Sequence, residues 1–520
     1  MKTLPAGITE GQTLTTDLEI GCDLAIIGSG AGGAVMAAVA AQAGLSVVVI
    51  EEGGAFGTER FRGREDEAYP FLYQDGGQRA TKDGAIAILQ GRALGGGTTI
   101  NWTTCFRTPD YIVDHWRAKH AVGAVSVAEL NPHWEWAEQR LGIAEVPEPL
   151  INANNQKLRD GATKLGLEVA KLRRNVIGCA GTGNCGHGCP IGAKQGMLVT
   201  LLPDAIKAGA AVLTRARADR VLYETARAVA VECTLLDAYG VEPTGLRATI
   251  KPRAVVVSGG AINSPALLLR SNTPDASGRL GRRTFLHPVV AVGGFFDDDV
   301  AGWRGPPQSV ASHAPAHRGD EMGYFLEAAP VHPMLAATSF TGFGGAHADL
   351  FVHLKHASAL IALQVDGLHD DVVGGTVSVQ PSGRAALDYP IVDRQWRGFI
   401  EAQKTLLKVA LAAGARYAVT LHEGTQRFAS EAELARVDAL PWRTGSVVIF
   451  SAHQMGGCMM SDDAKQGVVR STDLRHHQVD NLYVVDGSVF PTATGVNPQL
   501  SIYGLAHLAA TRIVDGLRKG

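Results

Sequence analysis

Cysteine is scarce in this sequence, with seven residues in 520, which is not the pattern of a disulfide-bonded scaffold. Acidic and basic residues nearly balance, at a net charge of −3, and no basic stripe indicates a nucleic-acid partner. The N-terminal residues contain no apolar run of the kind that forms a secretory signal. We therefore expect a cytoplasmic protein with reduced thiols and no nucleic-acid partner.

Charged residues are absent from residues 24–50, a stretch long enough for a transmembrane helix, which needs ~20 apolar residues. Glycines interrupt the stretch, however, and its period changes from an apolar run to an alanine-rich helix and back to an apolar run. The pattern predicts a strand at 24–27, a helix at 34–43 and a strand at 46–50. We expect no transmembrane segment.

Glycine, in contrast, is abundant: 62 of 520 residues is about 12%, against a typical ~7%. Gly28, Gly30 and Gly33 form a GxGxxG motif between the first strand and the helix. Such glycines allow a tight turn, close approach of a pyrophosphate and close helix–strand packing, and the helix N-terminus offers free N–H groups. Glu51 ends the second strand, where a carboxylate can bind ribose hydroxyls, although a solvated strand end is the alternative. The motif predicts a dinucleotide site without separating FAD from NAD.

Three further blocks accompany this motif. Residues 91–102 read GRALGGGTTINW, a glycine loop suited to a planar cofactor. Residues 253–271 read RAVVVSGGAINSPALLLRS and predict a strand at 254–257, then a helix opened by Ser264 as N-cap and Pro265. At the C-terminal end, HQMGGC begins at residue 453 and VVDGSVFPTATGVNPQLSI spans 484–502; these predict a strand at 482–485 and a long helix after Pro498.

With these four blocks in this order, the sequence resembles the glucose–methanol–choline (GMC) oxidoreductase family of flavoproteins. The resemblance covers both ends and the middle of the chain, while residues 300–440 match no known block, as expected of the part that selects the substrate. It implies an FAD-dependent alcohol oxidase or dehydrogenase, in which hydride passes from an alcohol to flavin N5. Some members attach flavin covalently through a histidine near residues 91–102; no histidine occurs there, so we expect non-covalent FAD.

The resemblance assigns the catalytic pair to His453 and Asn497. The histidine would take the alcohol proton, for which a base with a pKa near neutrality is suited. The asparagine would donate a hydrogen bond to the developing alkoxide without adding a competing acid. An asparagine at this place resembles the cholesterol oxidase and choline oxidase branches. Together with the cysteine block at residues 179–189, it also resembles sterol- and long-chain-alcohol-type members, which favours an apolar alcohol. The alternatives are a structural histidine and a turn asparagine before Pro498.

The resemblance also implies flavin contacts along the whole cofactor. These are Gly28, Gly30, Gly33 and Glu51 for the ADP half, the Ala218 backbone at the adenine, Gly95, Gly96 and Asn101 along the pyrophosphate and isoalloxazine, Asp486 and Gly487 at the ribityl–phosphate region, and Pro498 and Gln499 at the pyrimidine edge.

Three cysteines, Cys179, Cys185 and Cys189, lie within eleven residues of a glycine-rich segment. They could hold an iron–sulfur cluster or zinc, both of which usually take four ligands, with His187 or Cys105 as the fourth. A three-iron cluster would need only three. Some GMC-like proteins carry a similar block with four cysteines. We favour the metal-free alternative, a tight loop packed under the flavin domain or closed by one disulfide.

The predicted fold class is α/β, with a Rossmann-like FAD-binding domain and a second α+β substrate domain built on an antiparallel sheet. The first domain is expected at residues 15–110, 175–290 and 445–520, and the second at 111–174 and 291–444. The runs FLEAAP, LIALQVDG and GGTVSVQPSG predict strands of the antiparallel sheet.

Three questions stay open in the sequence. The electron acceptor could be oxygen, a quinone or a redox protein. A lyase with a redox-silent flavin and a non-catalytic flavin-binding scaffold share the same motifs. An NAD-dependent dehydrogenase is least favoured, since the C-terminal blocks would have no role in it.

Overall fold

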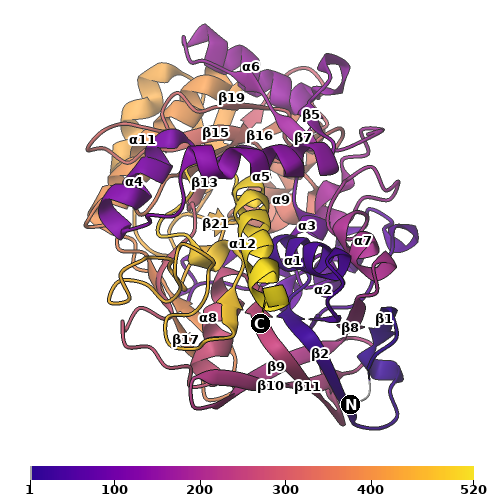
Figure 1. Cartoon of the computed structure of the whole chain (residues 1–520). Helices are drawn as coiled ribbons and strands as arrows, with labels where there is room; N and C mark the ends of the chain where they lie inside the picture. Colours follow the sequence, from indigo (N-terminus) through magenta and orange to yellow (C-terminus); the bar gives the residue numbers. More distant parts are fainter. Residues whose placement is uncertain (1–2, 520) are drawn as a thin grey trace.

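The computed structural model describes residues 3–519 and contains two large sheets, one in the lower and one in the upper part of Figure 1. The lower sheet has the strand order β1-β8-β3-β2-β11-β10-β9, with β23 pairing β11. Its strands are β1 (Gly7–Glu10), β2 (Leu18–Ile27), β3 (Val47–Ile50), β8 (Ala211–Thr214), β9 (Ala216–Glu224), β10 (Arg227–Leu236), β11 (Pro243–Val257) and β23 (Leu482–Val484). Neighbouring strands are parallel along the order β1-β8-β3-β2-β11, as in a Rossmann-like sheet. Strands β11, β10 and β9 continue the sheet as an antiparallel extension.

Helices cover this sheet from one side. The alanine-rich α1 (Ala31–Gln42) packs against α7 (Leu201–Lys207) and the C-terminal α12 (Gln499–Lys519), which crosses the centre of Figure 1 and packs in turn against α5 (Val127–Arg140). Small residues permit this close packing. Nine of the twelve residues of α1 are buried, and all of these except Val35 and Met36 are glycine or alanine. The Rossmann-like unit predicted from the glycine motif is confirmed.

One local prediction was wrong. The helix after β11, α8 (Gly260–Arg270), begins four residues before Ser264, so Ser264 and Pro265 lie inside it. Gly260, at a φ of +85°, makes the sharp turn that starts the helix directly after the strand. Ser264 accepts a hydrogen bond from the Gly259 N–H (2.8 Å) and donates to Asp486 (2.5 Å), so its hydroxyl braces the turn from within the helix.

The upper sheet has the order β20-β19-β13-β16-β15-β14-β6, with β21 joining β13 to β4. Its strands are β4 (Ile86–Ile88), β6 (Ala170–Lys171), β13 (Val289–Phe295), β14 (Val310–Ser312), β15 (Tyr324–Ala328), β16 (Ala357–Gln364), β19 (Tyr417–Thr420), β20 (Arg427–Phe428) and β21 (Ile449–Ser451). All pairs except β21–β4 are antiparallel, which confirms the predicted second sheet. The long helix α11 (Asp393–Ala412) packs on its central strands and against α6 (Ala153–Lys164).

The remaining elements are short. The predicted strand in GGTVSVQPSG is β17 (Gly375–Val379), but it belongs to a separate four-stranded sheet with β18 (Ala385–Asp388), β12 (Arg282–Phe285) and β22 (Met455–Gly456). A two-stranded sheet pairs β5 (Ile143–Glu145) with β7 (Arg173–Asn175). The other helices are α2 (Glu65–Leu72), α3 (Gly97–Ile100), α4 (Asp110–His120), α9 (Pro333–Ser339) and α10 (Gly344–Val352).

Several elements depart from the predicted domain boundaries. Strand β1 joins the lower sheet although it precedes residue 15, and β4 and β21 join the upper sheet although they fall in ranges predicted for the FAD-binding domain. Helix α5, predicted in the second domain, packs against α12 of the first. A short apolar strand is compatible with either sheet, so its sequence alone does not determine its partner. The division into two domains otherwise stays a prediction.

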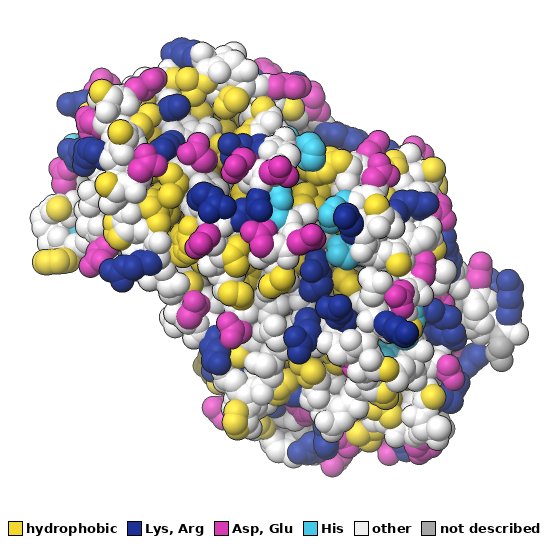
Figure 2. All heavy atoms as spheres, turned by 90° about the vertical axis from the view of Figure 1, so that its left-hand side faces the viewer, with side chains coloured by type: hydrophobic (Ala, Val, Ile, Leu, Met, Phe, Trp, Pro, Cys, Tyr) yellow, Lys and Arg dark blue, Asp and Glu magenta, His cyan; other side chains and the backbone are white. Residues whose placement is uncertain are grey.

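The described surface is mixed in charge. Figure 2 shows Lys and Arg side chains interspersed with Asp and Glu over the face that it draws. Among the helices of residues 3–519, none is both long and apolar enough to cross a membrane.

The tight contact between α1 and the glycine turn makes Gly33→Ala a test of the fold. A methyl group at Gly33 would overlap the carbonyl oxygen of Gly28, which is backbone and has no room to move. We expect a loss of about 1–3 kcal/mol or more in the free energy of unfolding, as for other overpacked sites, measured by chemical denaturation. Gly516→Ala in α12 is the matched control, because nothing lies within 4 Å of its added methyl group. Equal stability of the two variants would contradict the packing described.

Candidate active site

A cavity of about 1350 Å³ lies between the two large sheets. At one end it is lined by the glycine turn after β2 and by the end of β3. At the other end it reaches His453, Asn497 and residues of β13, β15 and β16. The cavity is therefore long, and its two ends are formed by different sheets.

The glycine turn leaves the start of α1 open toward the cavity. Gly30 is the N-cap of the helix and no side chain caps it, so the first N–H groups are free for a ligand. Gly96 comes so close that a methyl group there would lie 2.7 Å from the Gly30 Cα atom. Gly28 has a φ of +103°, and a side chain there would overlap the Ser258 carbonyl. Two glycine loops thus form a backbone cradle suited to a phosphate group.

Glu51 is buried at the edge of this cradle and lines the cavity. Its Oε2 accepts hydrogen bonds from the Ser29 N–H (3.1 Å) and hydroxyl (2.6 Å), and its Oε1 accepts one from the Gly53 N–H (2.8 Å). Burial raises the pKa of Glu51, and these hydrogen bonds oppose the rise. The carboxylate is held in one orientation, with lone pairs left for a ligand hydroxyl.

Two further polar side chains line the middle of the cavity. Asp486 Oδ2 accepts hydrogen bonds from the Gly260 N–H and the Ser264 hydroxyl, and so joins the start of α8 to the segment after β23. Asn101 Nδ2 donates to Gln499 Oε1 (2.7 Å), while Asn101 Oδ1 is buried without a hydrogen-bond partner. Buried polar atoms are almost always paired, so Asn101 Oδ1 is suited to accept from a ligand N–H.

The structure brings most of the predicted cofactor residues to one cavity. Gly33 and Gly95 do not line it: Gly33 packs against the Gly28 carbonyl, and the Gly95 N–H donates to Ser29 Oγ (3.0 Å). The predicted residues that line the cavity are Gly28, Gly30, Glu51, Gly96, Asn101, Ala218, Asp486, Gly487, Pro498 and Gln499.

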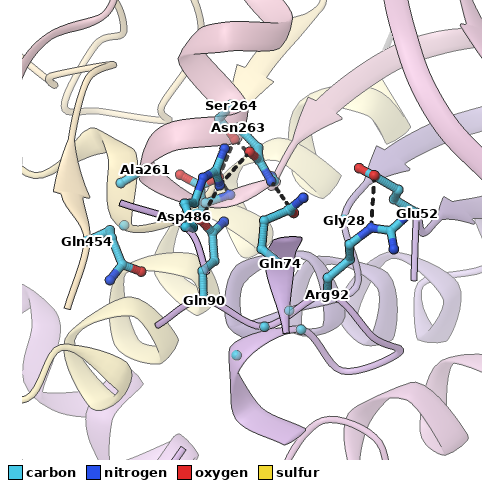
Figure 3. Close-up of a pocket in the computed structure, with 18 of the residues that line it drawn as sticks. Gly28, Glu52, Gln74, Gln90, Arg92, Ala261, Asn263, Ser264, Gln454 and Asp486 are labelled. Atoms are coloured by element: carbon cyan, nitrogen blue, oxygen red, sulfur yellow. Dashed lines mark hydrogen bonds and ion pairs between the residues drawn. The ribbon is translucent and has the colours of Figure 1, made fainter. Parts of the chain in front are cut away.

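A polar rim on the same cavity was not predicted from the sequence. Figure 3 shows Asn263 and Gln74 pointing toward one another, and Arg92 pointing toward Glu52. The nearly buried Arg79 donates to Gln90 (2.5 Å) and Asn263 (3.0 Å). Arg92 and Asn263 lie inside motif blocks, but these side chains come from segments far apart in the sequence, so only the fold brings them together.

The predicted catalytic pair meets at the far end. Asn497 Nδ2 lies 3.5 Å from His453 Nε2, and both residues line the cavity. Burial lowers the pKa of His453 to about 4, so its imidazole is neutral at pH 7. That pKa is lower than the near-neutral value expected from the sequence, because the ring is removed from water.

The neighbours of His453 select its tautomer. His453 Nδ1 lies 3.2 Å from His287 Nδ1, so one of the two nitrogens donates. If His453 carried its proton on Nε2, that N–H would face the Asn497 amide donor. The proton is therefore assigned to Nδ1, donating to His287, which leaves the Nε2 lone pair facing the cavity. The His287 ring is positioned through its backbone, since the Leu286 and His287 N–H groups both donate to Asp366 (2.9 and 3.0 Å).

Glu327 on β15 completes this group and was missed by the sequence analysis. Its side chain is fully buried, lines the cavity, and accepts hydrogen bonds on Oε2 from Gln308 (2.5 Å) and Asn497 (3.4 Å). Burial raises the pKa of Glu327 to about 8, so the carboxyl is protonated at pH 7. Its Oε1 is buried without a partner. The signal in the sequence that could have identified it was that Glu327 is a single acidic residue within the apolar run FLEAAP.

The walls around this polar group are apolar. No lining residue contributed by β13, β16 or β21 carries a charged side chain, and the residues are Val289, Ile361, Leu363 and Phe450. This end of the cavity is suited to an alcohol with a hydrocarbon body.

The cysteine block packs beneath the cavity without forming a metal-binding group of its own. All seven cysteines are free thiols, so the suggested disulfide is not formed. Among residues 3–519, Cys179, Cys185 and Cys189 belong to no cluster of three or more potential metal ligands. The buried Lys194 donates to the carbonyls of Cys185, Thr99 and Asn101, which ties this loop to the cavity wall.

Comparisons with known proteins give family matches over most of the chain. Two models of the GMC oxidoreductase family match residues 69–289 and 375–506, and an NAD(P)-binding Rossmann-like model matches residues 26–79. An uncharacterized GMC-type oxidoreductase of Mycobacterium tuberculosis is 34% identical, over 95% of this chain and 76% of its own length. A long-chain-alcohol oxidase of Arabidopsis thaliana is 30% identical, over 96% of this chain and 68% of its own length.

Two solved structures share the fold. Pyridoxine 4-oxidase from Mesorbium loti superposes with a TM-score of 0.69 at 18% identity, covering 94% of this chain and 99% of its own. A formate oxidase from Aspergillus oryzae has a TM-score of 0.69 at 13% identity, covering 97% of this chain and 100% of its own.

Proposed function

Because the chain belongs to the GMC oxidoreductase family, whose enzymes oxidise alcohol groups with FAD, we propose that it oxidises an apolar alcohol with His453 as base and Asn497 as hydrogen-bond donor. The observation that carries this proposal is the position of the two residues. They lie 3.5 Å apart at one end of a cavity whose other end has a backbone cradle suited to phosphate.

The cavity residues fit FAD. The uncapped start of α1 and the close approach of Gly30 and Gly96 suit the pyrophosphate, and the fixed Glu51 carboxylate suits a ribose. Asn101 Oδ1, buried and unpaired, would accept from the flavin ring. Bound FAD supplies the hydride acceptor of the reaction. We propose that it is held non-covalently, since His453 is the sole histidine among the described cavity-lining residues and none of them is cysteine.

The protein's own groups supply the proton chemistry. The His453 Nε2 lone pair takes the hydroxyl proton of the alcohol, and the resulting imidazolium keeps its Nδ1–H bond to His287. Asn497 Nδ2 donates to the oxygen on which negative charge develops. Glu327, protonated at pH 7, adds no negative charge next to that oxygen. The apolar walls exclude water, which strengthens each of these interactions.

The apolar walls and the long-chain-alcohol oxidases among the relatives support a substrate with a hydrocarbon chain, oxidised to an aldehyde or ketone. The relatives named as oxidases also favour oxygen over a quinone or redox protein as electron acceptor.

Anaerobic titration tests the proposed function. We expect linear alcohols of increasing chain length to bleach the flavin absorbance, with the rate rising with chain length because each buried CH₂ contributes about 0.8 kcal/mol. Readmission of air should restore the absorbance if oxygen is the acceptor. A flavin that stays oxidised with every alcohol would overturn the proposal in favour of a lyase or a flavin-binding scaffold.

A further inference from the structure

Two histidines and a glutamate meet outside the cavity, at a point where three distant segments of the chain come together. Glu65 is the first residue of α2, His187 ends the short turn 184–187 in the cysteine block, and His332 directly precedes α9. One potential ligand atom from each residue lies within 4.8 Å of those of the other two. Within residues 3–519, no other three His, Cys, Asp or Glu residues meet in this way.

Each histidine of this cluster has a buried ring nitrogen without a hydrogen-bond partner, Nδ1 of His187 and Nε2 of His332. The two residues are only 3% and 6% exposed, and their ring centroids are 4.4 Å apart. Buried polar atoms are nearly always paired in folded proteins. Two unpaired nitrogens next to a carboxylate therefore indicate a ligand that binds all three.

The three side chains are held in place by other contacts. Glu65 Oε2 accepts a hydrogen bond from the Met334 N–H (2.8 Å), and Oε1 accepts one from the Leu335 N–H (2.9 Å). The backbone of Gly183 hydrogen-bonds to the His332 ring. Metal-binding histidines typically carry such a backbone bond on the second nitrogen, which fixes the ring and its tautomer.

The charges of the cluster suit a cation. Glu65 supplies a negative charge. The positive charge of Lys194 is close enough to affect His187. Its ammonium group, however, is already bound to three backbone carbonyls.

We propose that Glu65, His187 and His332 bind a zinc ion, with water as the fourth ligand. Two imidazole nitrogens and one carboxylate oxygen in tetrahedral arrangement are a set that zinc takes in proteins. The three cysteines of the block are not part of the site, although His187 lies between two of them in the sequence.

The ion would join three segments that border the active site. Tyr73, directly after α2, donates from its hydroxyl to the Gly186 carbonyl (2.7 Å) and lines the FAD cavity. The same ion would hold the start of α9, where the Met334 side chain is exposed and after which that of Phe343 is exposed. The ion would therefore tie these segments together, and its binding does not depend on the proposed reaction.

Zinc binding by the FAD-loaded protein tests the site directly. The protein is treated with a chelator, dialysed, and titrated with Zn²⁺ alone in competition with a chromophoric chelator, and bound metal is counted by mass spectrometry. We expect one tightly bound zinc per chain. The variants H187Q, H332Q and E65Q should each weaken binding on the order of 100-fold or more, since loss of even an outer-shell partner costs 10–100-fold.

His353→Gln is the matched control, because His353 is exposed and lies outside the cluster. It should bind zinc as the unaltered protein does. Flavin content and circular dichroism show whether each variant is folded, and Co²⁺ in place of Zn²⁺ reports tetrahedral geometry at wavelengths beyond the flavin absorption. Absence of stoichiometric zinc, or equal affinity in all four variants, would overturn the proposal.

Discussion

The His453→Gln variant is expected to keep its FAD and to lose a factor of about 10²–10⁴ in kcat, the range that general-base catalysis typically contributes. Glutamine has a similar length and can still hydrogen-bond His287, so the cavity should keep its shape. It cannot accept a proton at neutral pH, and the alcohol would have to lose its proton to water. Stopped-flow reduction of the flavin by a bleaching alcohol measures this step directly.

The pH dependence adds a second readout for the same residue. The pKa of His453 lies at about 4, so the base is free throughout the neutral range, and on the acid side the rate should fall as pH drops toward 4. In the His453→Gln variant that acid limb should disappear. Both expectations follow from one property, the neutral imidazole in a buried site.

His422→Gln provides the control for burial. His422 is fully buried, and burial lowers its pKa to about 4 as it does for His453, but His422 does not line the cavity. Its ring nitrogen Nδ1 hydrogen-bonds the Thr420 hydroxyl at 3.1 Å. We expect near-normal flavin reduction in this variant. A His453→Gln rate within tenfold of the unaltered protein would show that His453 is not the base.

The ends of the cavity differ in how far the sequence predicts them. The nucleotide end depends on local geometry, because a strand, a glycine turn and a helix are adjacent in the chain. Each GxGxxG glycine occupies a backbone position where a side chain has no room or where a cofactor must approach. Such constraints leave a pattern in the sequence, and the Rossmann-like unit could be predicted from it.

The reactive end depends on contacts between distant residues. Glu327 was part of a predicted strand, but its partner Asn497 follows 170 residues later. Period-2 patterning shows that a strand exists, not which of its residues meets another segment. His287 is likewise placed by the backbone of its own loop and the remote Asp366. The histidine–asparagine pair could be inferred only because it resembles a family block.

The cysteine block shows the opposite case, where spacing suggested a site that the fold does not assemble. Three cysteines within eleven residues are close along the chain, but within residues 3–519 they belong to no group of three potential metal ligands. His187, weighed as a fourth ligand, instead meets Glu65 and His332 from other segments. Proximity in sequence predicts a metal site only when the intervening backbone turns the side chains toward one point.

We expect the unaltered protein to lose activity at alkaline pH and the Glu327→Gln variant to keep it. In the unaltered protein, Glu327 ionises near pH 8 and places a negative charge beside Asn497, where the alkoxide develops. Like charges repel, so kcat/KM should fall about tenfold per pH unit above 8, to about a hundredth of its plateau at pH 10. Glutamine has the same size and stays neutral, so the variant should hold its plateau. Flavin reduction rates between pH 6 and 10 measure the difference.

The same group makes stability depend on pH, with a sign that can be checked independently of the reaction. The native protein keeps the Glu327 proton up to about pH 8, while the unfolded chain releases it near the ordinary value of 4.5. The native state thus binds more protons in this window, and the contribution of Glu327 to the free energy of unfolding falls as pH rises from 4.5 to 8. Chemical denaturation should show a shallower decline in Glu327→Gln, and an unchanged decline in Glu401→Gln, whose carboxyl is exposed on α11. An identical pH slope in all three proteins would mean that Glu327 is ionised in the native state and cannot serve as the neutral neighbour of the alkoxide.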